Sequence, residues 1–137
     1  MTQFKVSEAA ALLGVSDDTI RRWADSGRID LVTPEQGAAV IEGAQLAELA
    51  QELAKDSALA NAFPASRASA RNRITGIVTK VTKDRVMAQV ELQAGPFRIV
   101  SLMSTEAADE LGLEPGSLAV ASVKATTVVV EVPEPHK

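Results

Sequence analysis

The sequence predicts a two-domain protein of the α+β class, with helices in the N-terminal part and a small β-barrel in the C-terminal part. Apolar residues recur at helical spacing from Val6 to Leu53, whereas they mostly alternate with polar residues from Ile74 to Val132. Between these stretches, residues 57–68 are small and polar and include a proline, which is typical of a linker. The predicted organisation is a helical domain at 1–56, a linker at 57–68, a barrel at 69–132 and a tail at 133–137.

The composition narrows the chemistry that the chain can perform. Its 137 residues include no cysteine, so neither a disulfide nor a thiolate metal site is available. His136, the single histidine, lies next to the C-terminal residue, where a catalytic or ligand role would be poorly supported. No stretch approaches the roughly 20 apolar residues of a membrane span, and the first residues lack the pattern of a signal sequence. We therefore expect a cytoplasmic protein with no metal-ion site and no membrane contact.

Two short helices are expected near the N-terminus. Ser7 is a suitable cap for a helix that ends at Leu13, because Gly14 is a natural helix stop. Ser16 can cap a second helix, which Gly27 ends. Two short helices joined by a tight turn form a helix-turn-helix.

A wing and a third helix complete the predicted N-terminal domain. Residues 28–43 contain a Pro/Gly turn that suits a small hairpin, and residues 44–54 place leucines on one stripe of a helix. This order is that of a winged helix-turn-helix, and it resembles the N-terminal module of the excisionase and MerR-like DNA-binding families over residues 4–54. The resemblance depends on two motifs, Val6-Ser7-Glu8-Ala9-Ala10-x-Leu12-Leu13-Gly14-Val15-Ser16 and Thr19-Ile20-Arg21-Arg22-Trp23-x-x-x-Gly27-Arg28.

The resemblance implies that the partner of this domain is double-stranded DNA. In such modules the second helix enters the major groove, where its exposed side chains meet bases and phosphates. Each phosphate contact needs a cation, yet residues 1–56 hold five Lys/Arg against ten Asp/Glu, and residues 36–42 of the wing have no arginine. A helical module that serves only in oligomerisation is therefore the alternative. The implied DNA-contacting residues are Lys5, Asp17, Asp18, Thr19, Arg21, Arg22 and Arg28.

The C-terminal part is expected to form a five-stranded barrel. A short helix capped by Ser104 follows the third strand, and this Greek-key-like order fits an OB-like β-barrel. OB barrels that bind oligonucleotides use aromatic platforms in a cationic groove. Since Phe97 is the only aromatic residue in these strands, we do not expect an oligonucleotide ligand. The predicted strands are Ile74–Thr82, Val86–Leu92, Phe97–Met103, Leu118–Lys124 and Thr127–Val132.

Two short segments at the ends of the predicted strands are rich in hydrogen-bond donors. Ser69-Ala70-Arg71-Asn72 precedes the first strand, and Lys124-Ala125-Thr126 joins the last two. Together with Leu111-Gly112-Leu113-x-Pro115-Gly116-Ser117, they resemble the molbindin domain, also called the TOBE or molybdenum-pterin-binding domain, from Ser69 to about Glu131. The resemblance implies that the barrel binds molybdate or tungstate as an intact oxyanion, with no catalytic cofactor.

The donors that the resemblance implies suit a dianion with four oxygens, because hydrogen bonds to charged groups are strong. Ser104 would contribute its hydroxyl from the start of the short helix, whereas Ala107 stands where the family has a second hydroxyl. Molbindin sites lie between subunits, which implies a homo-oligomer assembled through the barrel as a dimer, trimer or hexamer. The implied oxyanion-binding residues are Ser69, Ala70, Arg71, Asn72, Ser104, Lys124, Ala125 and Thr126.

Two functions follow from the combination of these domains. In the first, the protein is a molybdate- or tungstate-binding transcriptional regulator, in which oxyanion binding at barrel interfaces modulates DNA binding. In the second, it is an intracellular molybdate storage and homeostasis protein whose helical module organises the oligomer. An enzyme is not expected, because the sequence has no Gly-x-x-x-x-Gly-Lys-Ser/Thr loop and no nucleophile beside a base.

Overall fold

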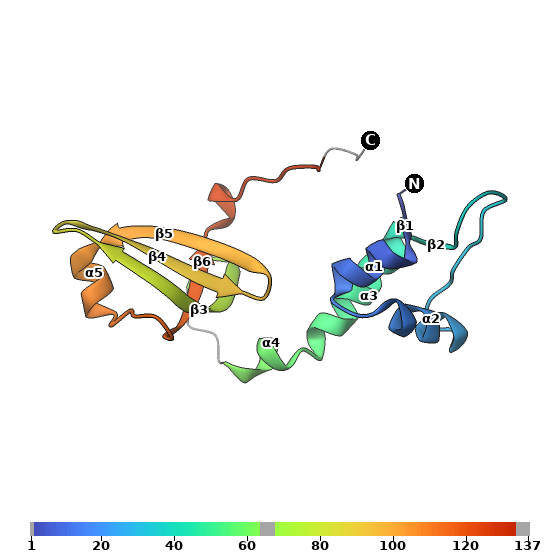
Figure 1. The fold of residues 1–137 in the computed structure, drawn as a ribbon, viewed down its shortest axis with the longest axis horizontal. Helices are drawn as coiled ribbons and strands as arrows, with labels where there is room; N and C mark the ends of the chain where they lie inside the picture. Colours follow the sequence, from blue (N-terminus) through green and yellow to red (C-terminus); the bar gives the residue numbers. More distant parts are fainter. Residues whose placement is uncertain (1, 64–67, 134–137) are drawn as a thin grey trace. The chain divides into compact units, whose positions relative to one another are not determined.

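The computed structural model describes residues 2–63 and 68–133, which belong to two compact units (Figure 1). The N-terminal unit is mainly helical, and the C-terminal unit is mainly an antiparallel sheet. In chain order, the N-terminal elements are β1 (Gln3–Lys5), α1 (Val6–Leu13), α2 (Asp17–Asp25), β2 (Val40–Glu42), α3 (Gly43–Lys55) and α4 (Ala58–Ala62). The C-terminal elements are β3 (Asn72–Lys83), β4 (Met87–Ala94), β5 (Phe97–Ser104), α5 (Thr105–Glu110), β6 (Leu118–Val123) and the 3-10 turn η1 (Ala125–Thr127).

The first two helices begin and end at residues that satisfy their free backbone groups. The carboxylate of Glu8 accepts a hydrogen bond of 2.9 Å from the backbone N–H of Lys5, so α1 begins at Val6 and the predicted cap at Ser7 is wrong. Gly14 ends α1 in the left-handed conformation with φ of 70°. The predicted cap of α2 is confirmed, since the Ser16 hydroxyl accepts from the Thr19 N–H at 3.1 Å.

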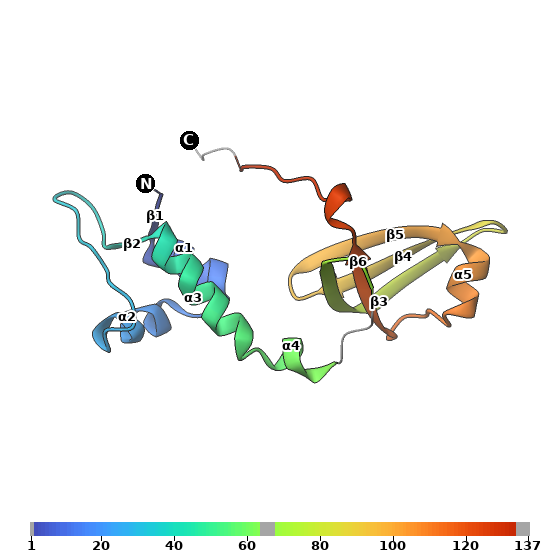
Figure 2. The same ribbon diagram turned by 180° about the vertical axis from the view of Figure 1, so that it is seen from behind.

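One apolar core holds the N-terminal unit together. Helices α1 and α3, which overlap in the views of Figures 1 and 2, both contribute residues to this core. Strand β1 pairs with β2 in an antiparallel register that places Phe4 opposite Ile41. The buried residues of the core are Val6, Ala9, Ala10, Ile20, Ile29, Ile41, Leu46 and Leu49.

The predicted wing hairpin at residues 28–43 is reduced to a single bridge. Val32 and Val40 exchange backbone hydrogen bonds of 2.9 and 2.8 Å, and the segment between them is mostly exposed and irregular. Strand β2 also pairs with β1, which leads directly into α1. A three-residue strand such as β1 carries no periodicity, so the sequence did not indicate this partner.

The predicted linker at 57–68 includes the short helix α4. Residues 64–67 of that segment and residues 134–137 of the predicted tail, with His136, lie outside the described residues. None of the helices in residues 2–63 and 68–133 is long and apolar enough to cross a membrane.

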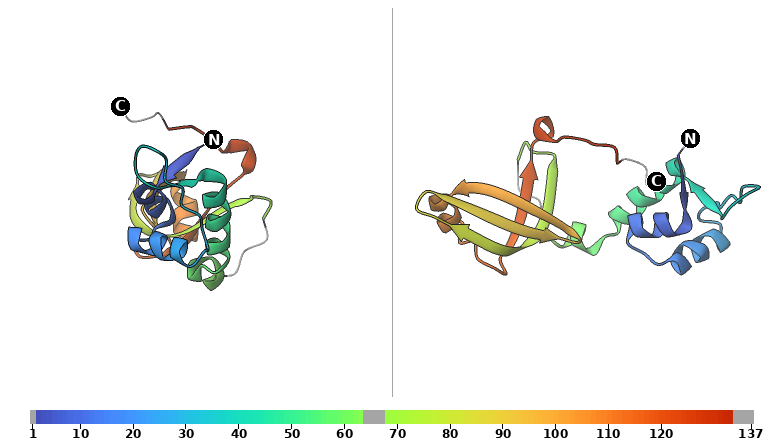
Figure 3. Two further views of the ribbon diagram at one scale, coloured as in Figure 1. Left: turned by 90° about the vertical axis from the view of Figure 1, so that its right-hand side faces the viewer. Right: turned by 45° about the horizontal axis from the view of Figure 1, so that its top comes forward.

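The C-terminal sheet has the strand order β5-β4-β3-β6, with every neighbouring pair antiparallel. The sheet is strongly curled, as the right-hand view of Figure 3 shows, and it encloses apolar side chains. The core of the sheet is the cluster of the buried residues Val78, Val90 and Leu92. Helix α5 follows β5 and packs on β4 and β5, with Ala108 fully buried.

The predicted fifth strand, Thr127–Val132, is not present. After β6 the chain makes the η1 turn and continues through residues 128–133 without regular structure. The side chains of Val129, Val130 and Val132 are 84%, 85% and 87% exposed. Valine-rich segments favour a pleated, half-buried surface, but a strand also needs a neighbour, and the described residues of this chain supply none here. Within residues 68–133 the sheet therefore has four strands rather than five.

At Gly76 the backbone of β3 passes close to the backbone of β4. A Cβ atom added at Gly76 would lie 2.8 Å from the carbonyl oxygen of Gln93. We expect Gly76→Ala to lower the free energy of unfolding of the C-terminal unit by about 1–3 kcal/mol, because backbone atoms must shift to admit the methyl group. Denaturant unfolding followed by circular dichroism measures this change.

The matched control is Thr82→Ala, at an exposed position of the same strand. It should leave the unfolding midpoint close to that of the unsubstituted protein. Equal stability of the Gly76→Ala variant and the control would show that the close approach at Gly76 is not a constraint.

Candidate functional site

The structure brings the two predicted donor segments together at one end of the sheet. Asn72, the first residue of β3, lies opposite Val123, the last residue of β6, and its side-chain amide donates to the Val123 carbonyl at 3.0 Å. Residues 69–71 therefore enter the sheet beside the point where residues 124–126 leave it. Antiparallel pairing is the physical cause, because it places the start of one strand next to the end of its neighbour.

Most of the side chains in these two segments face solvent. Ser69, Arg71, Lys124, Ala125 and Thr126 are exposed, and Ala70 and Asn72 are half-buried. The η1 turn is closed by Thr127, whose backbone N–H and hydroxyl donate to the Lys124 carbonyl at 3.0 and 2.9 Å. The arrangement presents a guanidinium, an ammonium and two hydroxyls on the same end of the sheet, which suits an anionic ligand.

Ser104 lies at the other end of the sheet. It is opposite Met87, and Ala88 is opposite Lys83, the last residue of β3. Residues 72 and 83 stand at the two ends of β3, so the separation along an extended strand of this length is up to roughly 35 Å. One chain therefore does not bring Ser104 together with the other predicted oxyanion-binding residues.

A set of backbone hydrogen bonds fixes the position of Ser104. Its hydroxyl accepts from the N–H of Ala107 at 3.1 Å as the cap of α5, so the hydroxyl hydrogen can still be donated outward. The next residue, Thr105, donates its hydroxyl to the Asp84 carbonyl at 2.9 Å and its N–H to the Val86 carbonyl at 2.8 Å. The two hydrogen bonds of Thr105 thus hold the start of α5 against the turn between β3 and β4.

The side chain of Asp84 organises that turn. Its carboxylate accepts from the N–H groups of Met87 and Val86, both at 2.7 Å. These two hydrogen bonds, with Met87 the larger cause, hold the pKa of Asp84 below its ordinary value. The sequence analysis missed this role, although an aspartate directly after a strand is a common signal for such a turn.

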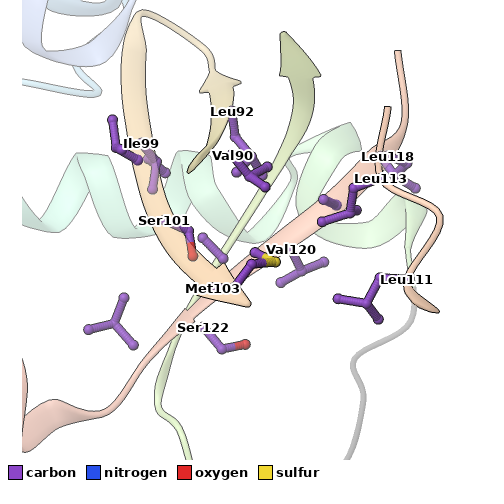
Figure 4. Close-up of a pocket in the computed structure, with 14 residues that line it drawn as sticks. Val90, Leu92, Ile99, Ser101, Met103, Leu111, Leu113, Leu118, Val120 and Ser122 are labelled. Carbon is purple, nitrogen blue, oxygen red and sulfur yellow. The ribbon is translucent and has the colours of Figure 1, made fainter. Parts of the chain in front are cut away.

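A cavity of about 450 Å³ opens between β5 and β6 on the inner side of the sheet (Figure 4). No charged side chain lines it, so it is unsuited to a dianion. The residues that contribute its apolar walls include Val90, Leu92, Ile99, Met103, Leu113 and Val120.

In the N-terminal unit, the predicted DNA-contacting residues fall into two groups. Asp17 and Arg21 of α2 line a cavity of about 220 Å³ with Lys5, next to Ala38 and Ala39 of the loop before β2. On another part of α2, the Thr19 hydroxyl lies 3.0 Å from the Ser16 hydroxyl and accepts from the Arg22 guanidinium at 3.0 Å. The side chains of Asp17, Asp18, Arg21 and Arg22 are all exposed.

Arg28 contacts other residues of the N-terminal unit. Its guanidinium lies 5.0 Å from the centre of the Trp23 ring and 3.9 Å from the carboxylate of Glu52 on α3. A cation over an aromatic ring gains about 0.5–1 kcal/mol at an exposed site. Arg28 therefore connects the end of α2 to α3, which leaves it less free for a phosphate than the sequence pattern indicates.

Comparison with known proteins identifies both units. Residues 68–130 match the TOBE domain family, and residues 4–53 match a helix-turn-helix domain family. Over 63 residues, 45% of this chain, the sequence is 40% identical to molybdenum-pterin-binding protein 2 of Clostridium pasteurianum and covers 93% of that protein. The chain belongs to the TOBE-domain family. The resemblances inferred from the sequence motifs are thus confirmed for both units.

Two further relatives each match about half of this chain. The chain is 38% identical over 65 residues to the molybdenum transport protein ModE of Herbaspirillum seropedicae, a match that covers 47% of this chain and 24% of that protein. Among solved structures, the match to the cytoplasmic molybdate-binding protein ModG has 42% sequence identity and a TM-score of 0.47. It covers 50% of this chain and 49% of that protein. Both donor segments and Ser104 lie within the residues that match the TOBE domain.

The role of Asp84 has a pH-dependent consequence. A carboxylate whose pKa is lowered by folding stabilises the folded state above its unfolded pKa of 3.8, and this contribution disappears as the pH falls through the folded pKa. We expect Asp84→Ala to be less stable than the unsubstituted protein near neutral pH. The difference should shrink well below pH 3.8, which thermal unfolding at both pH values measures.

Asp84→Asn is the matched control, because its side-chain oxygen still accepts a hydrogen bond without a charge. It should lose less stability than Asp84→Ala at neutral pH. A stability difference between the unsubstituted protein and Asp84→Ala that is the same at both pH values would contradict the role of the carboxylate.

Proposed function

We propose that the TOBE domain binds molybdate or tungstate as an intact tetrahedral oxyanion. The observation that carries this proposal is the pairing of β3 with β6, which sets the segment 69–72 beside the segment 124–126. The match to the TOBE domain family, residues 68–130, includes both segments. The protein acts on its ligand by binding and not by catalysis.

The donors of these segments fit the ligand's chemistry. Lys124 and Arg71 partly neutralise the two negative charges, and the hydroxyls of Ser69 and Thr126 and nearby backbone N–H groups supply further hydrogen bonds. Each hydrogen bond to a charged group contributes about 1.5–3 kcal/mol. Four or five of them are compatible with a dissociation constant on the order of micromolar, which corresponds to about 8 kcal/mol.

The oxyanion rather than a pterin is the proposed ligand. A pterin ring calls for aromatic side chains on which it can stack. In residues 68–133 Phe97 is the only aromatic residue, and it lies at the turn between β4 and β5, away from the charged segments. The domain offers charge and hydrogen-bond donors in place of a stacking surface.

A complete site requires more than one copy of the chain. Ser104 and the segment 124–126 lie at opposite ends of the sheet, so one ligand can reach both only if they come from different copies. We infer that the chain assembles into a homo-oligomer through its barrel, with oxyanion sites between subunits. In this assembly the Ser104 hydroxyl at the start of α5 in one copy lies beside the charged groups of another copy.

The leading role for the whole chain is a transcriptional regulator whose helix-turn-helix unit binds double-stranded DNA. The match to a helix-turn-helix family favours this role. Exposed side chains on α2, including Arg21 and Arg22, provide the surface for the major groove. Oxyanion binding regulates DNA binding only if it favours one arrangement of the subunits over another.

Storage and homeostasis of molybdate is the second candidate. The N-terminal unit has twice as many acidic as basic residues in 1–56, and the loop at 33–39 has no Lys or Arg. Arg28 is engaged by Trp23 and Glu52, which reduces the free positive charge further. In this role the helical unit serves the assembly of the oligomer.

Calorimetric titration tests the oxyanion site. We expect Lys124→Ala and Arg71→Ala each to weaken molybdate binding about 10- to 100-fold, because each removes a charge-assisted hydrogen bond. Lys80→Ala, which removes an exposed cation from the middle of β3, is the matched control and should bind as the unsubstituted protein does. Titration with tungstate and sulfate shows how far the site selects by size. Equal affinity of all three variants for molybdate would refute the proposed site.

DNA footprinting at physiological salt, with and without molybdate, separates the two roles. A regulator protects an operator in at least one of these states, whereas a storage protein protects none. We expect Arg22→Ala to weaken protection and to reduce the salt dependence by about one phosphate contact. Arg98→Ala, an equal change of charge on the TOBE domain, should leave protection unchanged.

A further inference from the structure

A cleft of about 220 Å³ in the N-terminal unit gathers residues from three separate parts of the chain. Lys5 and Ser7 lie where β1 passes into α1, Asp17 and Arg21 belong to the first two turns of α2, and residues 38–39 belong to the loop before β2. The two loop residues are alanines, so they add no charge and leave room for a ligand. The walls of the cleft therefore combine charged and hydroxyl groups with small apolar side chains.

The two cations of the cleft, Lys5 and Arg21, are not engaged elsewhere. Neither forms an ion pair with another residue in the described part of the chain. The other two arginines of the unit, Arg22 and Arg28, already have partners on α2 and α3. In a unit with an excess of acidic residues, two available cations beside one cleft indicate a site for an anion.

The donors of the cleft favour a tetrahedral oxyanion. The guanidinium of Arg21 presents a fork of N–H groups, the ammonium of Lys5 is a compact charge with three donors, and the hydroxyl of Ser7 adds one more. The oxygens of a tetrahedral anion point in several directions, so such an anion can accept from donors on separate elements at once. Asp17 has the opposite effect, because its carboxylate repels an anion in the same cleft.

We propose that this cleft binds one phosphate group, which Lys5 and Arg21 hold together and whose affinity Asp17 limits. The group can belong to the backbone of a DNA duplex or be free inorganic phosphate, because the two share the same chemistry. The duplex form rests on the proposed DNA-binding role of the unit, whereas the free form does not. The cleft is separate from the oxyanion site proposed for the TOBE domain, since its residues all belong to the N-terminal unit.

The duplex form has a consequence for regulation. A single phosphate site that a neighbouring carboxylate weakens gives one helix-turn-helix unit little affinity for DNA. Several units held in one assembly bind far more tightly than one, because each further contact is made at a high effective concentration. DNA binding would then depend on how many units the assembly presents at the same time.

Fluorescence anisotropy with a labelled duplex of mixed sequence and about 40 base pairs tests the duplex form, because phosphate contacts do not depend on sequence. The full-length chain carries Lys5→Ala, Arg21→Ala or both substitutions. The matched control is Lys55→Ala, an equal loss of charge at the last residue of α3. We expect the double variant to bind at least about tenfold more weakly, and Lys55→Ala to change the affinity less than about threefold.

The salt dependence shows whether the two cations share one phosphate. In the double variant the slope of log affinity against log salt should fall by about one, because one phosphate is no longer neutralised. Each single variant keeps a cation on that phosphate, so its slope should change by less than about half as much. A fall of about two in the double variant would show two separate phosphates and would overturn the shared site.

Amide NMR with inorganic phosphate tests the free form residue by residue, with chloride at equal ionic strength as the reference. Saturable shifts are expected at residues 5–7 and 21, and the double variant should lose them. Asp17→Asn should strengthen phosphate binding at least about threefold, because it removes the repelling charge. Asp25→Asn, the same change at the exposed last residue of α2, should leave it unaltered. All substituted residues are exposed, and circular dichroism checks the fold of each variant.

The possible outcomes separate this site from the proposed function. If the double variant binds the duplex normally and phosphate gives no saturable shift in the cleft, the site is overturned and the regulator role stands. If the unsubstituted chain binds no duplex, the regulator role falls, and the phosphate titration decides the cleft by itself. Saturation by phosphate without any effect of the variants on duplex binding would identify the free anion as the ligand.

Discussion

Strand β3 is the constraint on which the TOBE domain depends, because it pairs with β6 along its first half and with β4 along its second half. The pairing with β6 sets Arg71 close to the segment that carries Lys124. The pairing with β4, and of β4 with β5, carries Ser104 to the far end of the same strand. The composition of the candidate site thus follows from hydrogen-bond register. Gly76 permits this arrangement, since a side chain there would collide with the backbone of β4.

Charged side chains make different contacts in the two units. In the helix-turn-helix unit, Arg28 is held between Trp23 and Glu52, and the exposed arginines of α2 stand among carboxylates. In the TOBE domain, Asp84 is held by backbone N–H groups, and Arg71 and Lys124 remain exposed at the end of the sheet. Free positive charge is therefore better placed for a small dianion than for a long run of phosphates.

The proposed oxyanion site connects ligand binding with assembly. Ser104 and the donor segments lie at opposite ends of the sheet, so one ligand reaches both only across copies. In the proposed oligomer the ligand favours one arrangement of the copies, which provides a physical basis for coupling the ligand to the helix-turn-helix units.

The sequence by itself determined the elements whose cause is local. Helical periodicity and the Ser16 cap predicted α2, alternation predicted the four strands of the sheet, and two short motifs identified the TOBE domain. Only the tertiary structure decided which elements meet. It reduced the predicted wing to one bridge and paired β2 with β1, left residues 127–132 without a strand partner, and separated Ser104 from Lys124. The reason is that local pattern reports the conformation and the burial preference of a segment, whereas strand partners depend on register between residues far apart in the chain.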